Sequence, residues 1–210
     1  MSLFSSNSGL SRAGASPYPI RVVVVLRLGY RLGLPLPWQQ CYTEHWRRSH
    51  KRTVENMHDY TEAAAALQVT FDHEIPITGH IGIRVESYDG KRLVLRAPLK
   101  PNINHKATAF AGSLNSLVTL AGWGLIWLLL REWNISATTV IQDSACNYRR
   151  PVTRDFTATC VKPDEAELAY FARMLREKGR ARLELQAEMR ENDLVAVSFS
   201  GRYVVHVHQA

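Results

Sequence analysis

The chain has 210 residues, of which 46% are hydrophobic, and a formal net charge of +7 at pH 7; this suits one globular domain with some additional sequence. The positive charge is concentrated in residues 1–52, which hold eight of the 26 lysines and arginines and one of the 19 acidic residues, so 53–210 are neutral. Because a nucleic-acid-binding domain is expected to carry its own basic face, we predict no nucleic-acid partner.

Residues 1–52 are also rich in Ser, Gly, Pro and Arg, a composition that cannot bury much apolar surface. We therefore predict a basic, disordered extension at 1–52, followed by a folded domain at 53–210. An organelle leader or a start upstream of the natural one are the alternatives. The apolar run Val22–Leu26 is too short for a membrane span, and no clear signal-peptide pattern surrounds it.

Metal and disulfide chemistry is not indicated. The cysteines Cys41, Cys146 and Cys160 form no CxxC pair and no even framework, which is typical of free thiols in a reducing compartment. His206 and His208 share one face of a predicted strand, but two histidines without a third ligand do not make a metal site. We predict a cytoplasmic protein with no metal and no cofactor.

The predicted elements alternate between helices and antiparallel hairpins. A helix opens at Thr53 and is broken by Pro76 and Gly79. A hairpin then turns at Asp89-Gly90, where apolar residues alternate on both arms. A long apolar helix follows, then two strands, an amphipathic helix and a second hairpin.

The segment Ala107–Leu130 contains no charged residue and is long enough to cross a membrane. Its first half is rich in Gly, Ser, Thr and Asn, which a lone helix in lipid seldom carries. A helix that is apolar all round, among six strand-forming segments, is better explained as the core of a sheet that wraps it. We therefore predict an α+β fold and no membrane span.

One side of this helix carries small and polar residues. The positions that follow each other at steps of three and four are Gly112, Asn115, Thr119, Gly122 and Ile126. Close packing on the sheet is one interpretation. The other is that a ligand approaches Gly112, because the first turn of a helix offers unpaired amides and a positive dipole end, as an oxyanion hole does. Thr108 is the expected N-cap.

These residues resemble a known family. The long helix with a glycine near its start, after an Asn-containing loop, is similar to the hot-dog fold of acyl-thioester enzymes. More narrowly, the sequence resembles the YiiD C-terminal-type putative thioesterase family from about Thr53 to Val205, in the stretches "APLKPNINHKATAFAGSLNSLVTLAGWGL", "YRRPV", "GRARLELQAEM" and "FSGRYVV". The resemblance implies a curved antiparallel sheet around one central helix, and a homodimer or dimer of dimers. It also implies hydrolysis of acyl-CoA or acyl carrier protein thioesters, as in fatty acid metabolism.

The resemblance further implies roles for individual residues. Asn104 matches the loop asparagine of hot-dog thioesterases by its spacing to Gly112. The amides of Gly112 and Ser113 would bind the thioester oxygen, and Asn115 adds a polar group on the same stripe. Thr119 stands where many relatives carry Asp or Glu. Because a hydroxyl cannot act as a carboxylate base near pH 7, we assign Thr119 to substrate binding.

The general base must then be another residue. His105 has a suitable intrinsic pKa as a histidine, and Asp143 lies on a strand that approaches the partner's helix in such dimers. Residues at and beyond the end of that strand are predicted to contact the substrate, the arginines through phosphates of its carrier: Asn147, Tyr148, Arg149 and Arg150. Each of these polar residues also has a plain interpretation as an exposed surface group.

Two other function classes are compatible with a hot-dog fold. A dehydratase would need a His-and-Glu pair with a Pro-Gly helix start, which the sequence lacks. A non-catalytic acyl-thioester binding or regulatory module is the alternative that Thr119 supports, because it replaces the usual carboxylate.

Overall fold

The computed structural model describes residues 59–208. The predicted extension at 1–52 therefore lies outside the described residues, as does the expected helix start at Thr53.

The elements follow the predicted order. A helix occupies 59–74, and the elements after it are α3 (Ile77–Ile81), β1 (Arg84–Tyr88), β2 (Arg92–Ala97), the short 3-10 helix η1 (Lys100–Asn102), α4 (Ala111–Glu132), β3 (Ala137–Tyr148), β4 (Phe156–Val161), α5 (Glu165–Lys178), β5 (Arg180–Glu191) and β6 (Leu194–Val207).

Glycines mark two of the predicted chain reversals, one of them at a different position from the expected one. Gly90 turns the first hairpin with φ +83°, as predicted. Gly79 was expected to break the first helix, but it lies inside α3, which ends at Gly82 with φ +79°. The difference arises because the interruption at Pro76 is followed by a new helical turn, and only Gly82 takes the left-handed conformation that stops it.

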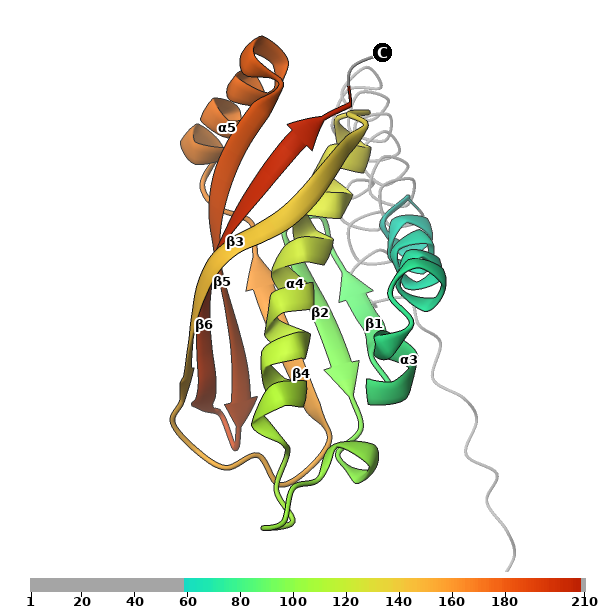
Figure 1. The fold of residues 1–210 in the computed structure, drawn as a ribbon, viewed down its shortest axis with the longest axis vertical. Helices are drawn as coiled ribbons and strands as arrows, with labels where there is room; N and C mark the ends of the chain where they lie inside the picture. Colours follow the sequence, from blue (N-terminus) through green and yellow to red (C-terminus); the bar gives the residue numbers. More distant parts are fainter. Residues whose placement is uncertain (1–58, 209–210) are drawn as a thin grey trace, which may run out of the picture. The chain divides into compact units, whose positions relative to one another are not determined.

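The six strands form one antiparallel sheet in the order β1-β2-β4-β5-β6-β3. The sheet curves around α4, which contacts β2, β3, β4, β5 and β6 (Figure 1). The predicted α+β architecture, a curved sheet around one long helix, is confirmed.

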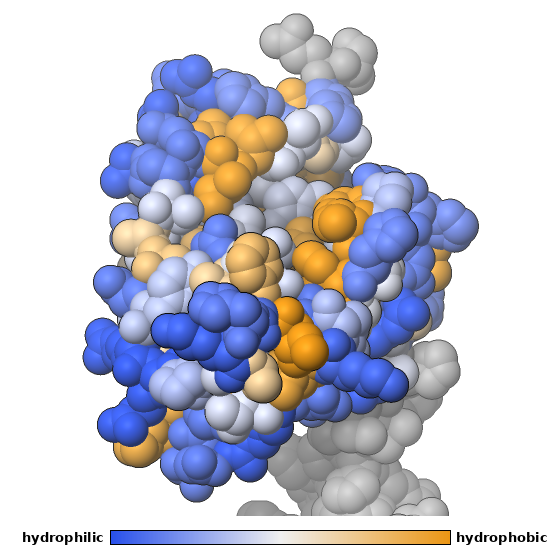
Figure 2. Space-filling model, turned by 60° about the horizontal axis from the view of Figure 1, so that its bottom comes forward, coloured by the Kyte–Doolittle hydropathy of each residue, from blue (hydrophilic) through white to orange (hydrophobic). Residues whose placement is uncertain are grey.

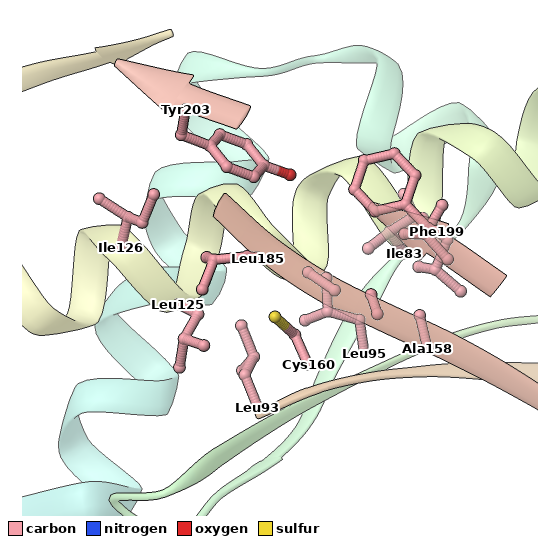
Figure 3. Packing of buried hydrophobic residues seen from close by; sticks show 14 of the residues in the cluster. Ile83, Leu93, Leu95, Leu125, Ile126, Ala158, Cys160, Leu185, Phe199 and Tyr203 are labelled. Atoms are coloured by element: carbon pink, nitrogen blue, oxygen red, sulfur yellow. The ribbon is translucent and has the colours of Figure 1, made fainter. Parts of the chain in front are cut away.

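Helix α4 is the centre of the hydrophobic core. Its side chains at Leu125 and Ile126 are fully buried, and residues from β2, β4, β5 and β6 pack around them, as Figure 3 shows for Leu93, Cys160 and Leu185. By length and composition α4 could cross a membrane, but 67% of its apolar window is buried inside the protein. The structure therefore uses its apolar surface as the core of the sheet, which explains the uncharged run in the sequence.

The glycine at position 122 allows α4 to approach β6 closely. A Cβ atom at Gly122 would collide with the hydroxyl of Tyr203 and lie 2.6 Å from its Cζ atom. Tyr203 lies in the buried cluster (Figure 3) and is fully buried. Its hydroxyl donates a hydrogen bond of 2.7 Å to the carbonyl of Thr119. At this position the small-residue stripe therefore serves close packing.

The two edge strands of the sheet differ in their cover. The amide of Val85 in β1 donates to the side chain of Gln68, which comes from the helix at 59–74 (2.7 Å). Strand β3, at the other edge, is exposed along most of its length. Its large apolar side chains Val140 and Ile141 are 48% and 38% exposed. Within the part of the chain that the structure describes, the sheet thus keeps one long edge open.

Candidate functional site

The start of α4 is built differently from the expectation. The N-cap residue is Phe110, whose side chain makes no capping hydrogen bond, so the prediction of Thr108 as N-cap was wrong. Thr108 is held two residues before the cap, because the chain closes a small loop through the bridge between Ile103 and Ala109. Its hydroxyl pairs with the side chain of Asn104 instead.

Three amides at this helix start are free. The amide of Leu114 donates to the carbonyl of Phe110 (3.1 Å) and is the first to find an acceptor in the helix. Within residues 59–208, the amides of Ala111, Gly112 and Ser113 have no hydrogen-bond acceptor. They lie at the positive end of a 22-residue helix, so this end attracts an oxygen atom that gains negative charge.

The sequence suggested an open surface above Gly112, but the structure shows that this surface is covered. A Cβ atom there would collide with Cε1 of Phe110 and lie 3.0 Å from Cδ1 and Cζ. The phenyl ring therefore lies against the first turn of α4. The Phe110 side chain is itself 55% exposed.

The side chain of Asn104 organises the loop before the helix. Its Nδ2 atom donates to Thr108 Oγ1 (2.9 Å) and to the carbonyl of Ala109 (3.2 Å). Its Oδ1 atom accepts from the amides of Lys106 (2.8 Å) and Thr108 (3.3 Å). Because these bonds use the whole amide group, Asn104 positions the loop and has no free donor for a substrate. His105, beside it, is exposed.

A pocket of about 290 Å³ lies between this loop, the helix start and the end of β3. Its lining residues are Asn104, Ala109, Ala111, Leu114, Tyr148, Arg149, Arg150, Pro151 and Val152. The structure thus brings together four of the predicted site residues from distant parts of the sequence. Figure 2 turns this end of the molecule toward the reader, where hydrophobic side chains lie among hydrophilic ones.

Tyr148 connects β3 to the helix start. Its hydroxyl donates to the carbonyl of Ala111 (3.2 Å). Burial raises the pKa of Tyr148 to about 12, and the neighbouring Cys146 thiol adds to the rise. The phenol therefore stays protonated near neutral pH and is a hydrogen-bond donor at the pocket.

The two arginines at the pocket are fixed through their backbones. The amides of Arg149 and Arg150 donate to the carbonyl of Ala196 in β6 (2.8 and 3.2 Å). Both residues are exposed, and in the described part of the chain neither forms an ion pair. They are cations available to an anionic ligand.

A buried carboxylate, which the sequence reasoning missed, holds the turn after these arginines. Glu191 is 8% exposed and accepts from the hydroxyl (2.6 Å) and amide (3.3 Å) of Thr153 and from Arg154 Nε (3.3 Å). Burial alone would raise the pKa of Glu191, but the hydrogen bonds from Thr153 and the charge of Arg154 outweigh it and hold the pKa below its ordinary value.

Replacing Glu191 by glutamine tests this clamp through pH. Because the folded pKa of Glu191 is below the ordinary 4.5, its stabilising contribution is present above pH about 4.5 and is lost as pH falls through the folded pKa. We expect Glu191→Gln to lower the melting temperature at pH 7 by about 3–6 °C, the equivalent of about 1.5 kcal/mol for a hydrogen-bonded charge. The variant should also lose less stability than the wild type on acidification.

The measurement is thermal unfolding followed by circular dichroism at pH 7, 5 and 4. Glu188→Gln is the matched control, because Glu188 pairs with Arg190 on the same strand at a solvent-exposed site and such pairs contribute little. An identical acid dependence in the wild type and Glu191→Gln would show that Glu191 does not carry this effect.

Two predicted residues of β3 lie on the side of the sheet away from α4. Asp143 is opposite Arg202 in β6, with 3.2 Å between Oδ2 and Nη1, and Asn147 is opposite Ser198. Cys146 and Tyr148 are opposite Phe199 and Val197, which belong to the core, and so share the α4 face. The structure therefore does not bring Asp143 and Asn147 to the helix start within one chain. The irregularity between Ile141 and Asp143 shifts the alternation that the sequence shows.

Two polar residues further along α4 have free side chains. Asn115 and Thr119 are half-buried, and their side chains make no hydrogen bond within the described residues. Asn115 lies about one helical turn after Gly112 on the same side. Among side-chain amide groups without a partner in the described residues, it is the nearest in sequence to the unpaired helix-start amides. The sequence had instead indicated Asn104 as the asparagine of the site. Ser113, between them, is buried.

Sheet and helix together define the class of this protein. A curved antiparallel sheet wrapped around one long helix is the hot-dog fold, and free helix-start amides beside a pocket suit the handling of a thioester carbonyl. A model of the family described as "Putative thioesterase (yiiD_Cterm)" matches residues 64–207. The chain belongs to this family, as the sequence resemblance predicted.

Solved structures agree with this assignment. Protein OLEI01261 from Chlorobaculum tepidum TLS, of unknown function, is 36% identical, with a TM-score of 0.67 over 69% of this chain and 94% of that protein. The putative thioesterase from Shewanella oneidensis is 30% identical, with a TM-score of 0.61 over 70% of this chain and 99% of that one. PA5026 from Pseudomonas aeruginosa, at 20% identity and a TM-score of 0.60 over 69% and 95%, shares the fold.

Proposed function

We propose that this protein hydrolyses acyl thioesters at the start of α4, with water as the nucleophile and no cofactor. The observation that carries the proposal is the set of three free amides at Ala111, Gly112 and Ser113, beside a pocket of about 290 Å³. Membership of a thioesterase family supports the same reaction.

The amides act on the charge that develops during the reaction. Water attacks the carbonyl carbon, the carbonyl oxygen becomes an oxyanion, and the amides bind this oxygen more tightly in the transition state than in the substrate. The carbon–sulfur bond then breaks, the thiol takes up a proton, and a carboxylic acid remains. The side chain of Asn115, which has no other partner in the described structure, supplies a hydrogen bond to the carbonyl or to the water.

A proton acceptor for the attacking water is the open element of the site. No carboxylate is among the residues that line the pocket. Asp143 points away from α4, while His105 belongs to the loop that carries Asn104. We therefore favour His105 over Asp143 as general base, because edge-to-edge pairing of two sheets would leave Asp143 on the outer face.

The carrier of the acyl group is inferred from charge. Arg149 and Arg150 are exposed cations at the pocket, where they can meet the phosphates of coenzyme A or of a phosphopantetheine arm. We propose acyl-CoA as the substrate and acyl carrier protein as the alternative. The thiols of Cys146 and Cys160 are free, which suits the cytoplasmic location that we also propose.

We further propose a homodimer, or a dimer of dimers, formed through the open edge of β3. A long exposed edge with apolar side chains is a template for pairing with another strand. We expect sedimentation at micromolar concentration to show at least a dimer. Monomers alone at that concentration would contradict this assembly.

Release of free thiol from a panel of acyl-CoA esters, followed with a thiol reagent, tests the function. We expect turnover that needs no added metal. The second candidate is a non-catalytic acyl-thioester-binding module, supported by the pocket without a carboxylate and by Thr119. Calorimetric binding of ketone analogues, in which a methylene group replaces the thioester sulfur, together with no thiol release, would support that module and overturn hydrolysis.

A further inference from the structure

The ring of Phe110 lies against Gly112 and so covers part of the proposed thioester site. Its backbone is fixed at both ends: its amide donates to the carbonyl of Asn102 (2.7 Å), and its carbonyl accepts from the amide of Leu114 (3.1 Å). Asn102 is buried and bonded in turn to the carbonyls of Ile81 and Pro98. The pivot of the side chain is therefore rigid.

The ring itself is held weakly. It is 55% exposed, and within residues 59–208 it makes no contact with another aromatic ring. Its neighbour is the bare backbone of Gly112. A ring that is more than half exposed can rotate between staggered positions at a cost of about 1 kcal/mol or less.

The present position of the ring exists only because residue 112 is glycine. Any side chain there would occupy the place of the ring edge, since an added Cβ collides with Cε1 of Phe110. The ring therefore rests beside the amides that are proposed to bind the carbonyl oxygen. A thioester that enters must displace the ring, and the ring can then close against the atoms next to the carbonyl.

We propose that the ring of Phe110 is a movable cover of the thioester site and sets how bulky the acyl group can be at its α-carbon. The proposal rests on the proposed function, because it assumes that the carbonyl binds at the start of α4. The ring closes easily beside a straight acyl chain and collides with a branch at the α-carbon. Phe110 is thus a specificity-determining residue for this reaction.

The test compares hexanoyl-CoA with α-methylhexanoyl-CoA. We expect the wild type to prefer the straight chain, and Phe110→Ala to reduce the ratio of the two kcat/KM values by about tenfold, the usual scale of discrimination for one methyl group. Phe110→Tyr, which keeps the ring, should retain the wild-type ratio. The matched control is Ile103→Ala, because Ile103 is equally exposed, at 55%, on the same loop but does not lie on Gly112.

A second pair of variants links the effect to the observed contact. Gly112→Ala should push the ring away and lower the same ratio. The double variant Phe110→Ala/Gly112→Ala should then show no larger change in the ratio than the single ones, because both remove one interaction. If the two substitutions change the ratio independently, so that their effects multiply in the double variant, the role of Phe110 as a cover is contradicted. A change of less than twofold in the ratio for Phe110→Ala would contradict it as well.

The binding of ketone analogues of both acyl groups separates this proposal from the hydrolase itself. If Phe110→Ala hydrolyses both substrates with an unchanged ratio of kcat/KM values, only the proposed role of Phe110 is contradicted. If the analogues bind but no thioester is hydrolysed, the proposed hydrolase function is contradicted. The ratio of the affinities for the two analogues in Phe110→Ala then still tests the role of Phe110 as a cover. Neither turnover nor binding of any analogue would overturn both.

Discussion

Replacing Asn115 by alanine is expected to lower kcat/KM for acyl-CoA hydrolysis by about 100-fold, the typical cost of losing one preorganised hydrogen bond to the developing charge. The melting temperature should stay within about 2 °C, because the Asn115 side chain has no partner in the described structure to lose. A large loss of rate without a loss of stability is characteristic of a group that acts on the substrate.

Asn104→Ala is the informative comparison, because the same amide group is removed from a position where it is fully used. It should lower stability by about 1–2 kcal/mol, since the amides of Lys106 and Thr108 lose their acceptor. Any fall in kcat/KM of Asn104→Ala should arise indirectly, because the loop before α4 is displaced. Both variants are measured by thiol release and thermal unfolding. If Asn115→Ala keeps near-normal hydrolysis, the carbonyl does not bind at this face of α4.

The second large effect is expected on stability. Gly122→Ala should lower the free energy of unfolding by about 3 kcal/mol, because overpacking costs about 1–3 kcal/mol and the bond from Tyr203 to Thr119 adds about 1 kcal/mol. The added methyl group collides with the hydroxyl and ring of Tyr203, which is fully buried and cannot move aside. The expected fall in melting temperature is about 6–12 °C.

Chemical denaturation of the variants in a double-mutant cycle measures this effect. Tyr203→Phe removes the hydroxyl, so the double variant Gly122→Ala/Tyr203→Phe should recover part of the loss, although Cζ still lies 2.6 Å from the added atom. Gly79→Ala is the control, because nothing lies within 4 Å of a Cβ there; it should be neutral or stabilising by up to about 1 kcal/mol. Additive losses in the cycle would show that Tyr203 is not what Gly122 accommodates.

The sequence by itself determined the elements whose signals are local. The uncharged run from Ala107 to Leu130 could bury its apolar surface only inside the protein or in lipid. The alternation of apolar and polar residues on both sides of Gly90 predicted a hairpin. The turn residues and apolar period of these segments were enough to predict an α+β sheet around a central helix. The combined motifs, from the loop before Gly112 to the last predicted hairpin, were specific enough to indicate the family.

Tertiary structure decided which polar groups are free. Asn104 and Asn115 look alike in sequence, but only the closed loop shows that the first is fully bonded. The irregularity in β3 places Asp143 away from α4, because one extra residue reverses every later side chain. Glu191 holds Thr153 across 38 positions of chain. Hydrogen-bond partners and faces of this kind depend on distant segments, and a local pattern carries no information about them.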